Sequence, residues 1–384
     1  MQAELDALRG AAMSAPAQSL QQTPLYNLHV QLGARLVPFA GYAMPVQYAG
    51  GIKHEHLHTR RAAGLFDVSH MGQISLRGTL AALEALVPGD IAGLALGQQR
   101  YSLLTNDAGG IIDDLMITRF ADHLHLVVNA AYKDSDFAHL AQGLGAQCEL
   151  KAHPELALLA LQGPAAAAVL DALCPAAGAL KFMQGCATAI KGVTVLVHRC
   201  GYTGEDGFEI AVANDAAEDL ARLLLAQPGV EACGLGARDS LRLEAGLCLS
   251  GADIDTSITP GEAGLNWTIA RKYLRKDASP ACFPGHTRIL DEARHGAARA
   301  RVGVRIRGRV PVRAGAALHD DSGRVVGVIT SGGFGPSLDA PVAMAYVEAA
   351  LAVPGTVLAV TIRNAEHLVD VAALPFVPHR YKKS

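Results

Sequence analysis

Two adjacent aspartates, Asp113 and Asp114, carry the first candidate chemistry of this sequence. They follow the turn sequence NDAGG (106–110), after which residues 111–120 alternate in hydrophobicity as a strand does. Successive strand side chains point to opposite faces, so we expect no direct carboxylate dyad here. If either carboxyl is buried, it must accept hydrogen bonds or have a raised pKa. The alternative is an aspartate that only stabilises a turn at a solvated strand end.

Glu209 is the second candidate, on the return strand of a predicted hairpin. Residues 194–199 and 208–212 read as its strands, joined by GYTGEDG (201–207). The three glycines of that loop form neither a dinucleotide fingerprint nor a phosphate loop, because no helix follows them. Glu209 faces away from its two apolar neighbours, so its carboxylate either meets water or accepts hydrogen bonds from a ligand.

Two arginines lie one helical turn apart in GLGARDSLRLEAG (234–246). Arg238 and Arg242 are predicted on a charged helix face opposite an apolar stripe. Two guanidinium groups so placed suit a carboxylate or a flat polar heterocycle. Intrahelical pairing with Asp239 or Glu244 is an equally good interpretation.

The spacing of the histidines and cysteines does not indicate a metal site. Of His54, His56 and His58, only the first and third share a helix face, and no carboxylate or cysteine is suitably spaced for a third ligand. The seven cysteines form no Cys-x-x-Cys pair and are odd in number, which disfavours a zinc knuckle or a disulfide framework. We therefore expect no metal and a reducing compartment.

The elements that position these residues belong to a chain of 384 residues, enough for two to three domains at about 150 residues each. Its 33 basic and 36 acidic residues argue against nucleic-acid binding. Polar residues and prolines interrupt the richest apolar stretch, 156–180, so no membrane helix is predicted. Residues 1–22 are expected to be a loose extension without a targeting pattern.

Residues 23–285 mix helical and strand patterns, which predicts an α+β region of two subdomains. A boundary is expected near 286–299, followed by a small C-terminal β-barrel or sandwich over 300–384. The helices are expected at residues 53–63, 81–86, 131–143, 165–173, 216–225 and 237–245, and the C-terminal strands at 302–306, 325–330, 342–347, 357–362 and 368–372.

An arginine stripe opens the C-terminal region. Its members all stand at odd positions with valine or isoleucine between several of them, so a strand would present one strongly basic face. That face is either simply solvated or a dock for an acidic partner or polyanionic ligand tail. The stripe consists of Arg299, Arg301, Arg305, Arg307, Arg309 and Arg313.

The motifs, taken in order, resemble the T-protein family of the glycine cleavage system, which are aminomethyltransferases. They run from TPLYNLHVQLGARLVPFAGYAMPVQY through GLFDVSHMG, NDAGGIIDDL, LALQGP, GYTGEDGFEI, GLGARDSLRLEAG and TSGGFGPSL to PFVP, and the likeness covers residues 23–381. The resemblance implies a cloverleaf of three domains around a central opening that holds tetrahydrofolate. Two of these domains are α+β and the third is the C-terminal β-barrel.

The resemblance also implies the reaction. The family takes an aminomethyl group from the dihydrolipoyl arm of the lipoylated H-protein, releases ammonia and forms 5,10-methylenetetrahydrofolate, in association with the P- and L-proteins. Tetrahydrofolate is thus the one-carbon acceptor. The resemblance implies the cytoplasm as the location for a bacterial source and the mitochondrial matrix for a eukaryotic one. The H-protein is acidic in this family, which makes the arginine stripe a candidate dock.

Site residues follow from the matching motif positions. The second aspartate of IIDDL, Asp114, matches the essential acid, and Glu209 would anchor the pterin. Motif positions that contact folate or lie near its pocket are matched by Tyr101, Asn129, Tyr202, Glu209, Arg238, Tyr381, Met71 and Trp267.

Two positions depart from the family pattern: Tyr42 replaces a tryptophan and Ser250 replaces a tyrosine. Neither is expected to touch the matched site residues, but both are expected to alter the edges of the pocket. Within the superfamily, a folate-dependent demethylase of the dimethylsulfoniopropionate type is an alternative function. A non-catalytic folate-binding protein is another, although retention of Asp114 favours catalysis.

Overall fold

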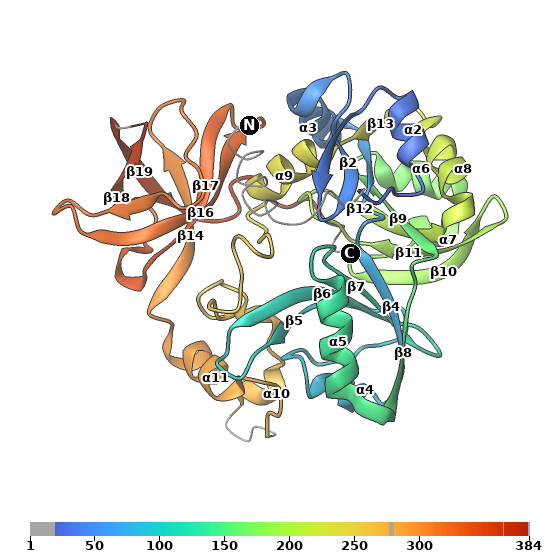
Figure 1. Ribbon diagram of the computed structural model, residues 1–384, viewed down its shortest axis with the longest axis horizontal. Helices are drawn as coiled ribbons and strands as arrows, with labels where there is room; N and C mark the ends of the chain where they lie inside the picture. The colour runs from blue at the N-terminus through green and yellow to red at the C-terminus, as the bar shows by residue number, and fades with distance from the viewer. Residues whose placement is uncertain (1–19, 276–279, 364, 383–384) are drawn as a thin grey trace.

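Three lobes surround the middle of the molecule in the computed structural model (Figure 1). The structure describes residues 20–275, 280–363 and 365–382, so most of the predicted extension, residues 1–19, lies outside the described part. Within the extension, Gln21 pairs with Tyr42 on a small two-stranded sheet. That sheet consists of β1 (Arg35–Phe39) and β2 (Tyr42–Gln47), preceded by α2 (Tyr26–Gln31).

A six-stranded sheet forms the first lobe, with the order β10-β11-β12-β9-β3-β13. Neighbouring strands are antiparallel except for β13, which pairs in parallel with β3 at one edge. Because side chains alternate, Phe208 and Ile210 pack under α6 and α8, whereas Ala211 packs toward α9. The elements are α3 (Gly51–Arg61), β3 (Ala63–Asp67), β9 (Leu156–Gln162), α6 (Ala166–Leu173), α7 (Pro175–Gly178), β10 (Gln184–Ile190), β11 (Val193–Arg199), β12 (Gly207–Ala213), α8 (Asn214–Leu225), β13 (Val230–Cys233) and α9 (Leu235–Glu244).

A five-stranded antiparallel sheet forms the second lobe, with the order β5-β6-β7-β4-β8. Leu115 and Ile117 of β6 pack with α5 in this lobe's core, while Met116 points to the opposite face, toward the first lobe. The elements are β4 (Gly72–Gly78), α4 (Leu80–Glu84), β5 (Gln99–Thr105), β6 (Ile111–Arg119), β7 (Leu124–Val128), α5 (Lys133–Leu144), η1 (Gly145–Gln147) and β8 (Cys148–Ala152).

The third lobe is a closed barrel with the strand order β14-β17-β16-β15-β18-β19. Its interior holds valine, leucine and isoleucine from alternating positions, as a small barrel requires. The strands are β14 (Arg299–Ile306), β15 (Ala317–His319), β16 (Val325–Gly335), β17 (Ala340–Glu348), β18 (Val357–Ile362) and β19 (Ala365–Ala372), with η3 (Ala349–Leu351) between β17 and β18.

The predicted barrel is therefore confirmed, as is the α+β character of the preceding region. The six helices predicted upstream are all present, with ends shifted by at most two residues. The three-residue strand β15 was missed because it is too short to show an alternating pattern.

The segment between α9 and the barrel contains η2 (Asn266–Thr268), α10 (Arg271–Leu274) and α11 (His286–His295). In Figure 1 it runs from α9 past β5 before the chain enters β14. After β19, the C-terminal residues return to the first lobe, where Arg380 pairs with the buried carboxylate of Glu205. None of the described helices has the length and apolarity needed to cross a membrane.

Candidate active site

Asp114 is held at the centre of a small polar network on β6. Asp113 is only 1% exposed, whereas Asp114 is half-buried on the other face, as the strand register predicts. Asn129, which directly follows β7, donates from Nδ2 to Oδ1 of Asp114 at 2.8 Å and to Oδ1 of Asp113 at 2.9 Å. One amide thus bridges two carboxyl groups that never meet directly. The alternative of a solvated turn aspartate is wrong for both residues.

The environment of Asp114 shifts its pKa upward, toward the protonated form. Burial, and secondly the negative charge of Asp113, raise the pKa of Asp114 to about 7, although hydrogen bonds from Asn129 and Tyr101 oppose this. A carboxyl group with that pKa titrates close to neutral pH. It therefore changes charge in the range where a general base or a charge-stabilising group operates.

Asp136 of α5 lies behind this pair and was missed by sequence reasoning. It is fully buried, and burial together with the charge of Asp113 raises its pKa to about 9, so it retains its proton at neutral pH. The two carboxyl groups are close enough for Asp136 to donate to Asp113. A signal was available, because Asp136 falls four and eight residues before Leu140 and Leu144 on the apolar helix face.

Ser250 also contacts this network. Its hydroxyl donates to Oδ1 of Asp113 at 2.5 Å, the same oxygen that accepts from Asn129. Asp113 is not one of the matched site residues, so Ser250 reaches Asp114 only through Asp113 and Asn129. Tyr42, the other departure from the family pattern, accepts a hydrogen bond from Nζ of Lys133 at 2.7 Å.

A stacked aromatic pair adjoins Asp114 through Tyr101. Tyr101 of β5 stacks on Trp267, with ring centroids 5.4 Å apart. Burial and the nearby charge of Asp114 raise the pKa of Tyr101 well above its usual value, so its hydroxyl remains a donor. Trp267 is 63% exposed, which leaves much of this large apolar ring uncovered.

Tyr202 and Arg238 form a second part of the site, on the first lobe. The Tyr202 hydroxyl donates to the Cys248 carbonyl, and the Arg238 guanidinium lies over the Tyr202 ring at 4.9 Å. Nη1 of Arg238 is buried and has no hydrogen-bond partner among the described residues. Because buried polar groups are normally paired, this N–H group is a candidate ligand donor.

Glu209 is buried, with 8% exposure, so the exposed-glutamate alternative is wrong. It points from β12 to the face on which Arg238 lies, and it accepts a weak hydrogen bond from the Cys200 thiol at 3.6 Å. Burial, and then the Glu209 charge, raise the pKa of Cys200 well above its usual value. Glu209 is thus a carboxylate with acceptor capacity left for a ligand.

Tyr381 closes this end of the site. Its ring stacks on Phe182 with centroids 4.1 Å apart, and it lies near enough to Cys200 for that thiol to influence its pKa. Burial is the main reason that the pKa of Tyr381 rises to about 12.

Met71 and Met116 pack against a hydrophobic cluster formed by residues of β9 and α9. Met116 lies on the face of β6 that also carries Asp114.

The two arginines of α9 have different roles. Arg242 is 3% exposed, so the predicted charged face is wrong for this residue. Its guanidinium pairs with Asp239 at 2.7 Å, as the intrahelical interpretation expects, and with Asp253 at 2.8 Å. Within the described part of the chain, Arg238 forms no such ion pair with a carboxylate. Only Arg238 therefore keeps a donor for a ligand.

The two parts of the site meet at Tyr202, whose pKa is raised by burial and, in smaller part, by the charge of Asp114. Two surface hollows, one lined by Tyr42 and Ser69 and the other by Asp107 and Phe283, contain none of the predicted site residues. The site is therefore defined by contacts between its side chains and by the unpaired donor of Arg238.

Comparison with known proteins identifies the family. Residues 25–273 match the GCVT N-terminal domain, and residues 299–378 match the glycine cleavage T-protein C-terminal barrel domain. The chain belongs to the glycine cleavage T-protein family. This confirms the resemblance inferred from the motifs.

Individual T-protein relatives match along nearly their whole length. The mitochondrial aminomethyltransferase of Gallus gallus is 46% identical, over 98% of this chain and 97% of that protein. The corresponding protein of Dictyostelium discoideum is 40% identical, over 96% of this chain and 95% of its own length. A crystal structure of glycine cleavage system aminomethyltransferase T from Bartonella henselae has a TM-score of 0.88 and 46% identity, covering 95% of this chain and 100% of that one. The predicted three-domain fold is thereby confirmed.

In the T-protein barrel, the arginine stripe does not form the strongly basic face that the sequence predicts. Arg305 is exposed, and its guanidinium lies 6.0 Å from the ring centre of Phe376. Four other members bind groups of this chain: Arg299 pairs with Glu262, Arg301 donates to the carbonyls of Ala263 and Gly246, Arg307 pairs with Asp370, and Arg309 pairs with Asp339. The stripe is therefore partly neutralised from within.

Proposed function

We propose that this chain is the aminomethyltransferase of the glycine cleavage system. It transfers the methylene carbon of the aminomethyl group on the dihydrolipoyl arm of the H-protein to tetrahydrofolate. The carbon–sulfur and carbon–nitrogen bonds break, two bonds to N5 and N10 of the folate form, and the two folate N–H protons leave on the thiol and ammonia. The observation that carries the proposal is the full-length family match, together with the Asp114 network.

Asp114 is the proposed catalytic residue. Expulsion of sulfur or ammonia leaves a cationic methylene iminium group, and a carboxylate fixed beside it lowers the energy of that charge. Asn129 holds the Asp114 carboxyl by a 2.8 Å hydrogen bond, so the group is oriented before the substrate binds. Its pKa of about 7 means that the charged form is available near neutral pH.

The pH dependence of turnover provides one prediction. Aminomethyl transfer is expected to slow below pH 7, approaching about tenfold per pH unit, because protonation of Asp114 removes the stabilising charge. The measurement is kcat/KM between about pH 5.5 and 8.5. Asp113→Asn should shift the acidic limb to lower pH, since the charge of Asp113 is one cause of the raised pKa. A limb that stays in place or moves upward contradicts this assignment.

Glu209 is the proposed pterin anchor. A pterin presents adjacent amino and ring N–H donors, and a buried carboxylate with one weak partner can accept both. Arg238, Tyr202 and Tyr381 are the proposed surrounding contacts, supported by the unpaired Arg238 donor and the ring stacking. The same proposal assigns the remaining predicted contacts, Tyr101, Asn129, Met71 and Trp267, to the part of the folate near Asp114.

Glu209→Gln tests this anchor. Losing charge-assisted hydrogen bonds worth about 1.5–3 kcal/mol should weaken tetrahydrofolate binding by roughly 10- to 150-fold. Calorimetric titration of folate measures the change, and kcat at saturating folate should remain close to wild type. Glu218→Gln, a change of the same kind at a side chain on α8 that is 35% exposed, is the control. Equal folate affinity in Glu209→Gln and wild type would exclude the anchor role.

The proposed donor is the lipoylated H-protein, with the P- and L-proteins acting on the same carrier. Membership of the family supports this proposal. The arginine stripe is partly paired within the chain, and its exposed member Arg305 is a candidate contact for the H-protein. All seven cysteines are free thiols, which suits a reducing compartment. The relatives from Gallus gallus and Dictyostelium discoideum are named as mitochondrial. We propose the mitochondrial matrix for a eukaryotic source and the cytoplasm for a bacterial one.

The decisive experiment mixes the purified protein with aminomethylated H-protein, with and without tetrahydrofolate. Release of ammonia together with folate-dependent formation of 5,10-methylenetetrahydrofolate is expected. Folate binding without turnover would overturn the proposal. Dimethylsulfoniopropionate, offered as a methyl donor, then separates a demethylase from a non-catalytic folate-binding protein.

A further inference from the structure

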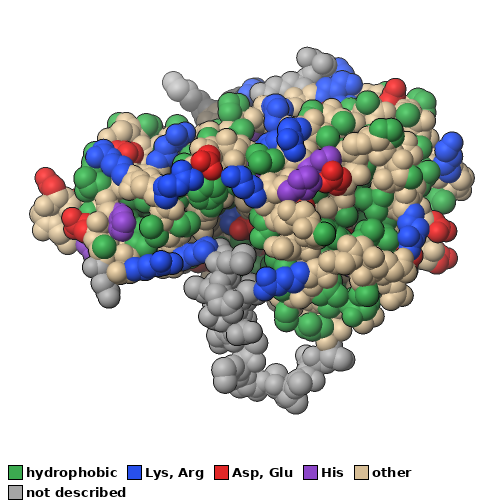
Figure 2. Space-filling view, turned by 90° about the horizontal axis from the view of Figure 1, so that it is seen from above, with side chains coloured by type: hydrophobic (Ala, Val, Ile, Leu, Met, Phe, Trp, Pro, Cys, Tyr) green, Lys and Arg blue, Asp and Glu red, His purple; other side chains and the backbone are tan. Residues whose placement is uncertain are grey.

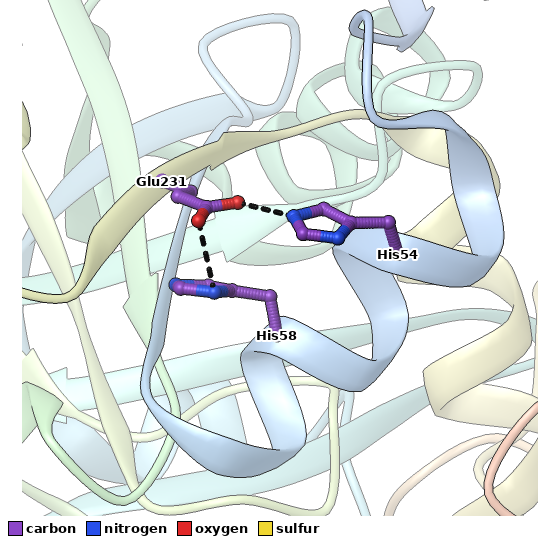
Figure 3. Close-up of side chains that lie close together, drawn as sticks. All are labelled: His54, His58 and Glu231. Atoms are coloured by element: carbon purple, nitrogen blue, oxygen red, sulfur yellow. Dashed lines mark hydrogen bonds and ion pairs between the residues drawn. The ribbon is translucent and has the colours of Figure 1, made fainter.

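Two histidines and a glutamate converge on the surface of the first lobe, on the sheet edge formed by β13. His54 and His58 lie one turn apart on α3, and Glu231 of β13 reaches both rings (Figure 3). Nε2 of His54 lies 2.7 Å from Oε2 of Glu231, and Nδ1 of His58 lies 3.1 Å from Oε1. The sequence spacing predicts no third ligand for these histidines, but the fold supplies one from 177 residues away.

The hydrogen bonding of His58 fixes which ring nitrogen is available. Its Nε2 lies 2.9 Å from the Gly229 carbonyl oxygen, and a carbonyl only accepts, so Nε2 carries the hydrogen. In the neutral ring, Nδ1 is then a lone pair that faces a carboxylate oxygen, which is also an acceptor. A cation placed between Nδ1 of His58 and the Glu231 oxygen accepts an electron pair from each of them. A backbone carbonyl that orients the opposite ring nitrogen is also the usual support of a metal-bound histidine.

The three donor atoms are close enough for one ion. All of them lie within 4.8 Å of one another, whereas tetrahedral zinc with bonds of 2.0–2.1 Å places its ligands roughly 3.3 Å apart. Small side-chain rotations therefore suffice. The two histidine rings are stacked at 5.9 Å, so both already face the same side of α3.

Exposure and charge also suit a cation. The side chains of His54 and Glu231 are 46% and 45% exposed, and that of His58 is 11% exposed, which leaves solvent access for water ligands. The carboxylate of Glu55 adds negative charge near both His54 and Glu231. Its own oxygens are occupied by the backbone N–H groups of Tyr48 and Gly234, so it does not compete as a ligand.

We propose that His54, His58 and Glu231 form a binding site for a divalent transition-metal ion, with zinc as the best-fitting ion. Two imidazoles and one carboxylate suit zinc, whereas magnesium and calcium require oxygen ligands. A bound ion would join α3 to the edge strand β13. Arg60, which pairs with Glu205 and Glu244, lies on a different face of α3. None of the three ligands is one of the proposed folate contacts.

Titration of the metal-free full-length protein with zinc chloride alone, against a competing chromophoric chelator, tests this site. One zinc ion per chain is expected, together with a rise in Tm that magnesium does not produce. His54→Gln and Glu231→Gln should each lower zinc affinity at least about tenfold and abolish the rise in Tm. His295→Gln removes an exposed histidine that pairs with Asp291, and Cys282→Ser removes the exposed thiol. Neither change should affect zinc binding.

Two outcomes of the binding titration would overturn the proposal. One is absence of saturable binding by the wild-type protein. The other is an equal zinc affinity of wild type, His54→Gln and Glu231→Gln. The cluster would then be an ion pair between a protonated histidine and Glu231, without a role in metal binding. Cobalt in place of zinc provides a direct view of the ligands, because nitrogen and oxygen donors give d–d bands without thiolate charge transfer. A strong thiolate band would place the ion at a cysteine and likewise overturn the assignment.

Discussion

Asp114→Asn is expected to slow aminomethyl transfer by roughly 10²- to 10⁴-fold while leaving tetrahydrofolate affinity nearly unchanged. The substitution keeps the side-chain volume and an oxygen that can accept from Asn129, so the local packing is preserved. It removes the negative charge that stabilises the developing iminium cation. Single-turnover formation of methylenetetrahydrofolate measures the rate, and calorimetry measures folate binding in the same preparation.

Asp113→Asn is the matched control for this prediction. It makes the same chemical change one residue away, on the opposite face of β6, where the carboxyl accepts from Asn129 and Ser250. We expect less than about a tenfold change in maximal rate, because Asp113 acts through the pKa of Asp114 rather than on the substrate. If Asp114→Asn weakened only folate binding and left the chemical step intact, its role would be that of an anchor.

Arg242→Met has the second large expected effect, on stability. It should lower the free energy of unfolding by about 3–5 kcal/mol, because it leaves the fully buried Asp253 carboxylate without its cation. The guanidinium also donates to Ser331 of β16 at 3.0 Å, so the change loosens the junction between α9 and the barrel. Urea unfolding monitored by circular dichroism measures the loss.

An exposed pair provides the comparison. Arg222 and Glu218 are four residues apart on α8 with 46% and 35% side-chain exposure, and Arg222→Met should cost about 0.5 kcal/mol or less. Adding Asp253→Asn to Arg242→Met should recover part of the stability, since it removes the unpaired charge. A loss below about 1 kcal/mol in Arg242→Met would mean that the Thr330, Ser331 and Leu249 donors satisfy Asp253 by themselves.

The sequence by itself determined the local elements and the family. Helix and strand positions were predictable because the apolar period reports which side of an element is buried. The opposite orientation of Asp113 and Asp114 followed from the strand alternation alone, and the observed burial agrees. The motif order identified the T-protein family, and with it a barrel whose closure the structure confirms.

Tertiary structure decided how distant side chains meet. Strand pairing places Asn129 beside Asp114, and the face shared by β12 and α9 buries Glu209. Arg242 pairs with Asp253, and His54 pairs with Glu231. No periodicity encodes such contacts, because each depends on the strand register or on the packing of separate elements, whether the partners are 11 or 177 residues apart in sequence. A charged residue on a helix or strand is predicted as solvated until the fold shows what covers it.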